Sequence, residues 1–261
     1  MANFTAKDVQ ALRQSTGAGM MDAKKALTEA DGDAEQATEI LRQKGLAKSL
    51  TRSDRENAEG LIAITTGDGN AALVQLRAET DFSAKSDEFV ALVASLAEHV
   101  LAKGADAIAE RQAEIDDLKL TTKENIALGD VVRYESQADT TIDAYLHGGG
   151  RVGVLVEGRG IDDELLHEIA LHIAFAKPRF LTRDEVPADE VEKERAALLE
   201  ITKAEGRVPE AKMPGVVEGR LGAWYGQQVL LDQGMFGEKE TVRKKIGDGE
   251  ILRFTVSVIG G

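Results

Sequence analysis

Three glycines in the sequence have the spacing of a dinucleotide-binding motif. Gly148, Gly150 and Gly153 satisfy the pattern Gly-x-Gly-x-x-Gly, in which the backbone approaches a pyrophosphate at the start of a helix. The run that follows, residues 154–156, is Val-Leu-Val, which is typical of a strand. We therefore interpret these glycines as the turn of a β-hairpin, with no bound dinucleotide.

Two groups of residues resemble metal ligands. His167 and His172 would lie roughly 140° apart around a helix, whereas helical metal ligands are spaced by three or four residues. Asp31 and Asp33 resemble the start of a calcium loop, but the required glycine at the sixth position is missing. No nucleophile elbow and no phosphate-binding loop occurs in the sequence. We expect no catalytic residue, no metal and no cofactor, although an enzyme that uses buried carboxylates stays an alternative.

The composition narrows the class of protein further. The chain of 261 residues contains no cysteine, which excludes disulfides, thiolate zinc sites and cysteine catalysis. Its net charge of -14 argues against direct nucleic-acid binding, because phosphates are neutralised by Lys and Arg. An apolar signal core and a run long enough to span a bilayer are both missing. We expect a cytoplasmic protein of two or three units that binds no membrane.

Two segments place apolar side chains where polar connections are expected. Phe82 lies between a predicted hairpin and its helix, and Met20 and Met21 lie in a predicted loop. An exposed phenylalanine leaves apolar area in water, and methionine suits adaptable protein interfaces. The alternative is that Phe82 is buried under its own subdomain and that the methionines fill a core.

The elements that would position these side chains begin with three short helices in residues 1–47. Thr5 and Asp8 predict an N-cap, Gly17 to Gly19 end the first helix, Asp33 and Gln36 predict a capping box, and Gly45 is expected to stop the third helix. We expect a small UBA-like docking bundle, followed by a polar linker over residues 48–59 that is helical at its start.

A hairpin followed by a helix is predicted twice in the rest of the chain. The first copy lies in core subdomain 1, residues 60–130, and the second lies in core subdomain 2, residues 131–261. A strand at 131–134 is expected to extend the second sheet. A helical hairpin is expected at about 188–226, and alternation over 252–258 predicts a closing strand. The fold class is therefore α+β, with two antiparallel-sheet and helix subdomains and an inserted helical hairpin.

Several of these segments together resemble the elongation factor Ts family. The two most specific matches are Leu12-Arg13-x-x-Thr16-Gly17-Ala18-Gly19-Met20-Met21-Asp22-x-Lys24-Lys25-Ala26-Leu27 and Glu79-Thr80-Asp81-Phe82-x-Ala84-Lys85. Shorter matches are Tyr145-Leu146-His147-Gly148, Arg151-Val152-Gly153-Val154-Leu155-Val156, Ala176-Lys177-Pro178 and Val217-Glu218-Gly219-Arg220. They occur in the family's order over nearly the whole chain.

The resemblance implies a guanine-nucleotide exchange factor that binds elongation factor Tu and promotes GDP release during translation elongation. The partner-binding residues that it implies are Arg13, Met20, Met21, Thr80, Asp81, Phe82 and His147. Of these, Phe82 would enter the partner near its magnesium-binding switch region, and the helical hairpin would be the family's coiled-coil projection. The sequence leaves open whether the chain works alone, as a homodimer or in a 2:2 complex.

Two departures from the family pattern affect these expectations. Ser83 occupies a position where the family usually has an apolar residue, and the sequence ends at Gly261 without the C-terminal helix of some members. The main alternative function is a helical-module adaptor that binds partners without exchanging nucleotides.

Overall fold

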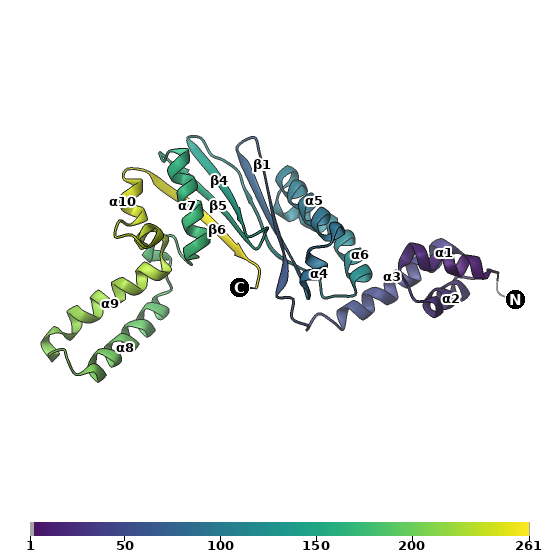
Figure 1. The fold of residues 1–261 in the computed structure, drawn as a ribbon, viewed down its shortest axis with the longest axis horizontal. Helices are drawn as coiled ribbons and strands as arrows, with labels where there is room; N and C mark the ends of the chain where they lie inside the picture. Colours follow the sequence, from purple (N-terminus) through teal and green to yellow (C-terminus); the bar gives the residue numbers. More distant parts are fainter. Residues whose placement is uncertain (1–2, 261) are drawn as a thin grey trace. The chain divides into compact units, whose positions relative to one another are not determined.

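The computed structural model describes residues 3–260, except for the side chains of residues 48–50. Helices and two three-stranded sheets make up the chain (Figure 1), which confirms the α+β class. Two compact units are present. The first comprises Met1–Thr65, Ala72–Arg133 and Val258–Gly261, and the second comprises Thr66–Ala71 and Tyr134–Ser257. The finer domain boundaries expected from the sequence stay predictions.

The N-terminal part of the first unit consists of three helices, which are α1 (Ala6–Thr16), α2 (Met20–Glu29) and α3 (Ala34–Leu50). The predicted N-cap of α1 is confirmed, because Thr5 and Asp8 form a reciprocal capping box. Gly17 ends α1 in the left-handed region with φ 65°. The small core of this bundle consists of Val9, Leu12, Ala23, Ala26, Leu27, Ala30 and Ala37.

Helix α3 does not stop at Gly45, so that prediction was wrong. The helix continues to Leu50, and a Cβ at Gly45 would lie 2.3 Å from Cδ2 of Leu120 in helix α6. The missing side chain allows α3 and α6 to approach closely, and Arg42 Nε pairs with Asp117 Oδ1 at 3.2 Å nearby. Gly45 is therefore a helix-packing residue. Spacing in the sequence cannot distinguish such a glycine from a C-cap.

The first sheet has the order β1-β2-β3 and contains β1 (Glu59–Gly67), β2 (Asn70–Ala78) and β3 (Ala127–Tyr134). Asp68 and Gly69 have φ values of 51° and 77°, as the predicted tight hairpin turn requires. Strand β3 was expected in the second sheet, and that prediction was wrong. Gly129 of β3 leaves the space that the Gln75 side chain occupies, and the Asp130 N–H donates to Gln75 Oε1 at 3.4 Å.

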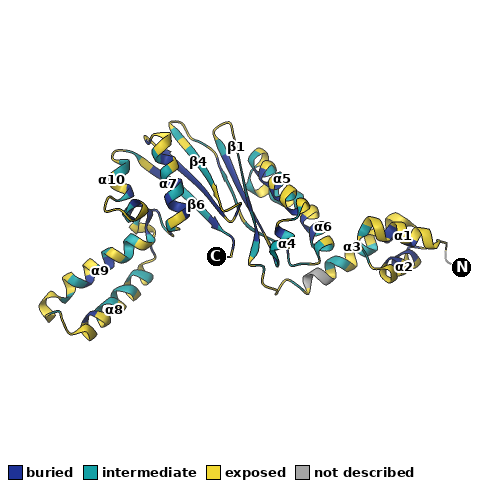
Figure 2. Ribbon diagram, in the orientation of Figure 1, coloured by how far each residue is buried: buried dark blue, intermediate teal, exposed yellow. Residues whose placement is uncertain are grey.

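Helices follow β2 and cover this sheet. They are α4 (Asp81–Ala84), α5 (Asp87–Lys103), the 3₁₀ helix η1 (Ala105–Arg111) and α6 (Gln112–Thr122). Figure 2 shows α5 with one buried face and one exposed face, as an amphipathic helix on a sheet requires. Its buried residues pack on side chains of β2 and are Phe89, Val93, Leu96, Ala97 and Val100.

The second sheet has the order β4-β5-β6 and contains β4 (Thr140–His147), β5 (Val152–Arg159) and β6 (Glu250–Val258). Strands β4 and β5 pair antiparallel, with Tyr145 opposite Val154 and His147 opposite Val152. Helix α7 (Asp163–Ala176) buries Leu166, Ile169 and Ile173. The predicted second hairpin, its helix and the closing strand are confirmed.

Helices α8 (Ala188–Glu205) and α9 (Met213–Gln228) lie side by side (Figure 1), with η3 (Glu210–Lys212) in their connection. Val217 and Leu221 of α9 are buried, and Arg220 pairs with Glu205 at 2.6 Å. These helices confirm the expected helical hairpin. The remaining short helices of this unit are η2 (Arg183–Glu185), η4 (Leu230–Asp232), η5 (Met235–Gly237) and α10 (Val242–Ile246).

Candidate partner-binding site

Helix α4 carries Phe82 and begins at a residue held from two sides. The Thr80 hydroxyl accepts the Ser83 N–H at 3.2 Å, which caps the helix. The same hydroxyl donates to Glu124 Oε1 at 2.7 Å. The second oxygen of Glu124 accepts the Glu79 and Thr80 N–H groups at 3.1 and 3.2 Å. One carboxylate therefore fixes the backbone from which α4 starts.

A second carboxylate supports the same backbone. Glu79 Oε1 accepts the Asn125 N–H at 2.7 Å and pairs with Arg55 Nη1 at 3.3 Å. The Asn125 amide in turn donates to the carbonyl oxygen of Arg55 at 2.7 Å. The segments around Arg55, Glu79 and Glu124 are thereby connected. Sequence reasoning missed Glu124 and Asn125, because they lie about 45 residues from α4 along the chain.

The Phe82 side chain is 84% exposed. The alternative that its ring is buried under its own subdomain is therefore wrong. The adjacent Ala84 is buried and anchors α4 to the core, so the short helix presents the ring outward from a fixed base. An exposed ring of this size has a free-energy cost in water that a partner's pocket would relieve.

Asp81 lies next to Phe82 on the exposed side of α4. Its Oδ2 accepts from Lys85 Nζ at 2.6 Å, and this hydrogen bond lowers the pKa of the Asp81 carboxyl below its ordinary value. The side chains of Lys85 and Asp81 are 75% and 46% exposed, so the ion pair is accessible to competing groups. Ser83, which departs from the family pattern, contributes its carbonyl oxygen to Ser86 Oγ at 2.8 Å. Ser86 caps α5.

The second expected contact region lies on the N-terminal helices. Met20 and Met21 begin α2 and are 49% and 62% exposed, so the interpretation of both as core filler is wrong. Arg13 is exposed in the last turn of α1. The Arg13 carbonyl accepts the Gly17 N–H at 3.0 Å, which fixes the turn between these helices. The bundle therefore presents two flexible apolar side chains next to a cation-bearing helix end.

His147, in the second unit, is the last residue of β4 and is exposed. Its Nδ1 lies 2.9 Å from the Tyr145 hydroxyl. The turn after it consists of Gly148, Gly149 and Gly150, all with positive φ, and β5 begins at Val152. The predicted turn is confirmed, and a strand stands where a dinucleotide motif would start a helix.

The other two histidines singled out by spacing have separate partners. His167 Nδ1 lies 3.1 Å from Asp143 Oδ2. His172 is buried, and its Nε2 lies 3.0 Å from Gln233 Oε1 while its Nδ1 accepts the Phe236 N–H at 3.1 Å. Burial lowers the pKa of His172 below its ordinary value. Over residues 3–260, no cluster of three or more His, Asp or Glu side chains suits a metal ion.

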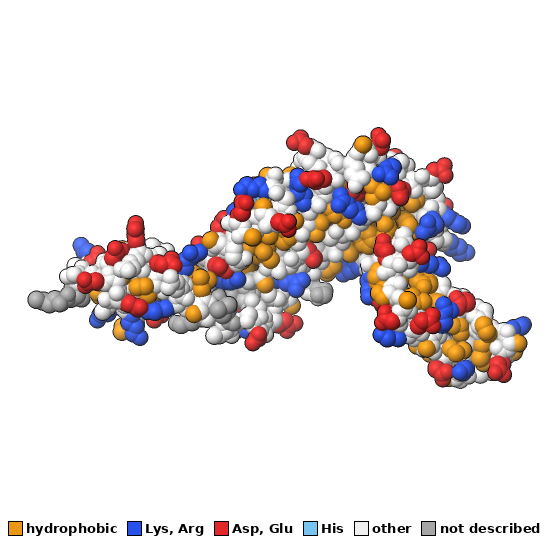
Figure 3. Space-filling view, turned by 180° about the vertical axis from the view of Figure 1, so that it is seen from behind, with side chains coloured by type: hydrophobic (Ala, Val, Ile, Leu, Met, Phe, Trp, Pro, Cys, Tyr) orange, Lys and Arg blue, Asp and Glu red, His pale blue; other side chains and the backbone are white. Residues whose placement is uncertain are grey.

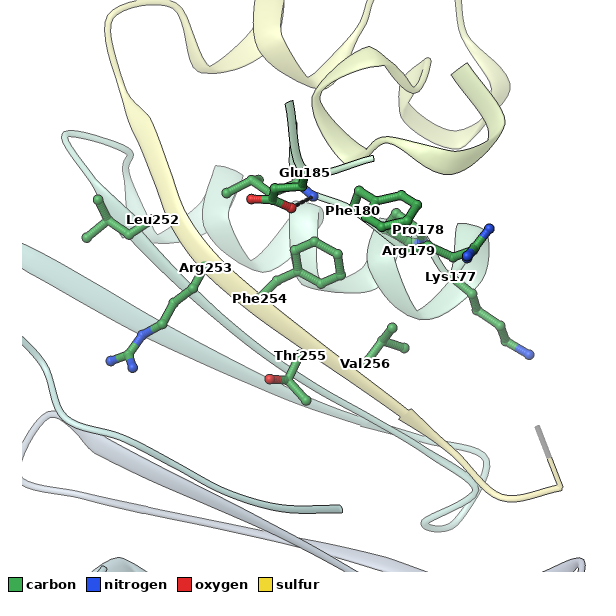
Figure 4. Close-up of a pocket in the computed structure, with 11 residues that line it drawn as sticks. Lys177, Pro178, Arg179, Phe180, Glu185, Leu252, Arg253, Phe254, Thr255 and Val256 are labelled. Carbon is green, nitrogen blue, oxygen red and sulfur yellow. Dashed lines mark hydrogen bonds between the residues drawn. The ribbon is translucent and has the colours of Figure 1, made fainter. Parts of the chain in front are cut away.

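An open groove of about 680 Å³ lies beside β6 in the second unit (Figure 4). Phe180 and Phe254 point toward one another across it (Figure 4). Three of the charged groups that line it, Arg179, Glu185 and Arg253, have partners within the chain. Glu185 accepts the Leu181 N–H at 2.7 Å, and Arg179 pairs with Glu190. These contacts stabilise the loop after α7 and assemble no nucleophile with a base.

The exposed side chains of the chain are of the kinds found on protein-binding surfaces. Acidic and basic side chains are interspersed over the face shown in Figure 3, and hydrophobic side chains lie exposed along the α8–α9 pair. Ile201 of α8, for example, is 51% exposed. In the described part of the chain, no helix has the length and apolar character to cross a membrane. An α+β scaffold that presents an aromatic ring and a methionine pair to solvent is typical of a protein-binding factor.

Comparison with known proteins identifies the kind of factor. A family model described as Elongation factor TS matches residues 79–260. A relative named elongation factor Ts from Clavibacter michiganensis subsp. michiganensis is 45% identical over 98% of this chain and 97% of its own length. Relatives of the same name from Clavibacter sepedonicus and Paenarthrobacter aurescens are 44% and 42% identical, each over 98% of this chain and over 97% and 98% of their own lengths. The chain belongs to the elongation factor Ts family.

Proposed function

We propose that this chain is a guanine-nucleotide exchange factor that binds elongation factor Tu and accelerates its release of GDP during translation elongation. Family membership supports the activity and the partner. The observation that carries the mechanism is the 84% exposure of Phe82 on a helix fixed at its base. The adaptor alternative has no support from the relatives, which share the name of an elongation factor.

The exchange mechanism needs no chemical step from this protein. In the GTPase, phosphate contacts and the magnesium ion hold GDP. Suppose that a factor binds the GTPase more tightly when those contacts are broken. The factor then lowers the affinity of the GTPase for GDP, and GDP lowers the affinity of the GTPase for the factor by the same ratio. Phe82 supplies such a preference if its ring is buried only in the opened form of the partner.

The free energy of burying one ring limits how far Phe82 alone can change the affinity for GDP. Burial of an aromatic ring contributes about 2 kcal/mol, which corresponds to roughly a thirtyfold change in affinity when it is confined to one state. Larger acceleration therefore requires further contacts. Arg13, Met20 and Met21 on the helical bundle, Thr80 and Asp81 beside the ring, and His147 on the second unit are the residues that we assign to them.

The proposed contacts fall into two groups. One group docks this chain on the partner, and the other opens the partner's nucleotide site. The exposed methionines would be buried against the partner in either nucleotide state, so they would set affinity. Phe82, held by α4, would set the difference between states. We infer that the complex forms in the cytoplasm and involves neither nucleic acid nor membrane.

Stopped-flow release of fluorescent GDP from elongation factor Tu tests the proposed activity. The expected result is a release rate that increases with the concentration of this chain and approaches a plateau. A pull-down that captures the partner, together with an unchanged release rate, would favour the adaptor.

A further inference from the structure

The histidine at the end of β4 is held by a neighbouring tyrosine. The turn that follows His147 consists of three glycines with φ of 61°, 65° and 92°, and none of these residues has a side chain that could pack on the ring. The Arg151 N–H donates to the His147 carbonyl at 3.1 Å, which fixes the backbone only. The hydrogen bond between the Tyr145 hydroxyl and His147 Nδ1, at 2.9 Å, is a side-chain contact that can orient the imidazole.

Tyr145 is well placed for this role. Residues 145 and 147 project from the same face of β4, because side chains alternate along a strand. The two rings lie 5.9 Å apart between centroids. The Tyr145 and His167 rings are nearly perpendicular, with their centroids 6.0 Å apart. His167 Nδ1 in turn lies 3.1 Å from Asp143 Oδ2. The phenol is half-buried, so its hydroxyl approaches His147 from a fixed position.

The chemistry of the two groups decides which one donates. A phenol O–H is a good donor, and the unprotonated nitrogen of a neutral imidazole is a good acceptor. When the hydroxyl donates to Nδ1, the imidazole proton must be on Nε2. The outward nitrogen of His147 then carries an N–H.

We propose that Tyr145 is a positioning residue, which holds His147 in the Nε2–H tautomer so that it offers a directed N–H to an acceptor oxygen on the docked partner. The docking half of this inference rests on the proposed function. The tautomer half concerns the free protein alone, so the two halves fail separately.

Histidine-ring nitrogen NMR on the free protein at pH 8, where an ordinary imidazole is neutral, tests the tautomer. The expected result is an Nε2–H signature for His147 in the wild type and a mixture of tautomers in Tyr145→Phe, which keeps the aromatic ring. Tyr225→Phe is the matched control, because Tyr225 lies on α9 against Trp224 and should leave the signature unchanged. The same tautomer in wild type and Tyr145→Phe would overturn the inference.

A double-mutant cycle for binding to elongation factor Tu tests the docking half. Tyr145→Phe should weaken binding by about three- to tenfold, as expected for one hydrogen bond, and should have no further effect when His147 is alanine. In His147→Gln, the side-chain amide occupies the place of Nε2 and donates without a tautomer, so this variant should retain most of the affinity and be insensitive to Tyr145→Phe.

The two experiments can reject the docking role of His147 and the positioning role of Tyr145 independently. A tautomer change in Tyr145→Phe with unchanged affinity would overturn the docking half of the inference, while Phe82-dependent exchange would stand. Additive effects of Tyr145→Phe and His147→Ala would show that the tyrosine acts by itself and would overturn its positioning role.

Discussion

The Glu124 carboxylate accepts the Thr80 hydroxyl at 2.7 Å, and through this bond a residue that follows α6 fixes the start of the helix that carries Phe82. The same carboxylate accepts two backbone N–H groups. The exposed ring is therefore supported by partly buried polar contacts at the base of its helix.

Replacement of Glu124 by alanine should reduce both stability and exchange. Two backbone donors and the Thr80 hydroxyl would lose their acceptor, at a cost of about 1–3 kcal/mol in the free energy of unfolding. GDP release should slow although Phe82 is intact, because α4 is no longer held. Urea denaturation and stopped-flow release measure the two effects. Glu98→Ala, on the exposed face of α5, is the control, and equal behaviour of the two variants would contradict the role of Glu124.

Truncation of two phenylalanines seven residues apart should change the free energy of unfolding by very different amounts. Phe82→Ala should leave the free energy of unfolding nearly unchanged, because the ring is 84% exposed. Phe89→Ala should cost about 3–5 kcal/mol, because that ring is fully buried against the first sheet. Thermal denaturation of both variants checks this contrast. A large loss of stability in Phe82→Ala would mean that the ring packs on its own unit.

Stability should decrease when the pH falls below about 6.5, because of His172. Burial lowers the pKa of this histidine in the folded state. Above the unfolded value of about 6.5, the ring is neutral in both states. Below it, the unfolded chain binds a proton that the folded chain does not, so the free energy of unfolding falls until the folded pKa is reached. The pH dependence should become shallower in His172→Gln; an identical dependence in both proteins would exclude His172 as the cause.

The hydroxyl of Ser257 should contribute nothing to stability. The side chain is buried in β6, and its oxygen has no hydrogen-bond partner among the described residues. Ser257→Ala should therefore be neutral or raise the free energy of unfolding by about 1 kcal/mol. Thr202→Val is the contrasting variant, because the Thr202 hydroxyl donates to the Leu198 carbonyl at 2.7 Å and its removal should not stabilise. A marked loss of stability in Ser257→Ala would reveal a partner for that oxygen.

The sequence predicted the parts of the fold that depend on local spacing. The N-cap at Thr5, the hairpin turns and the helices that follow them are all read from residues within a few positions of one another. Strand β3 was assigned to the wrong sheet, because alternation predicts a strand but does not identify its neighbour. Gly129, which admits the Gln75 side chain, gave no local signal.

In the candidate site, too, some residues could be identified from the local sequence and others could not. Phe82, Met20 and Met21 could be singled out from the sequence because apolar side chains in polar connections are unusual. Their exposure could not be predicted, since burial depends on distant segments. Glu124 and Tyr145 were missed for a related reason. A carboxylate near a helix end and a tyrosine in a strand are common, and their roles follow only from atoms brought within 3 Å.

The most direct test of the account is GDP release from elongation factor Tu by Phe82→Ala at a concentration that saturates binding. We expect this variant to bind the partner still, through the contacts that remain, and to give a plateau rate of release that is lower by about thirtyfold or less. Saturating the complex separates the opening step from docking. A plateau equal to that of the wild type would contradict the central claim that the exposed ring drives the release of GDP.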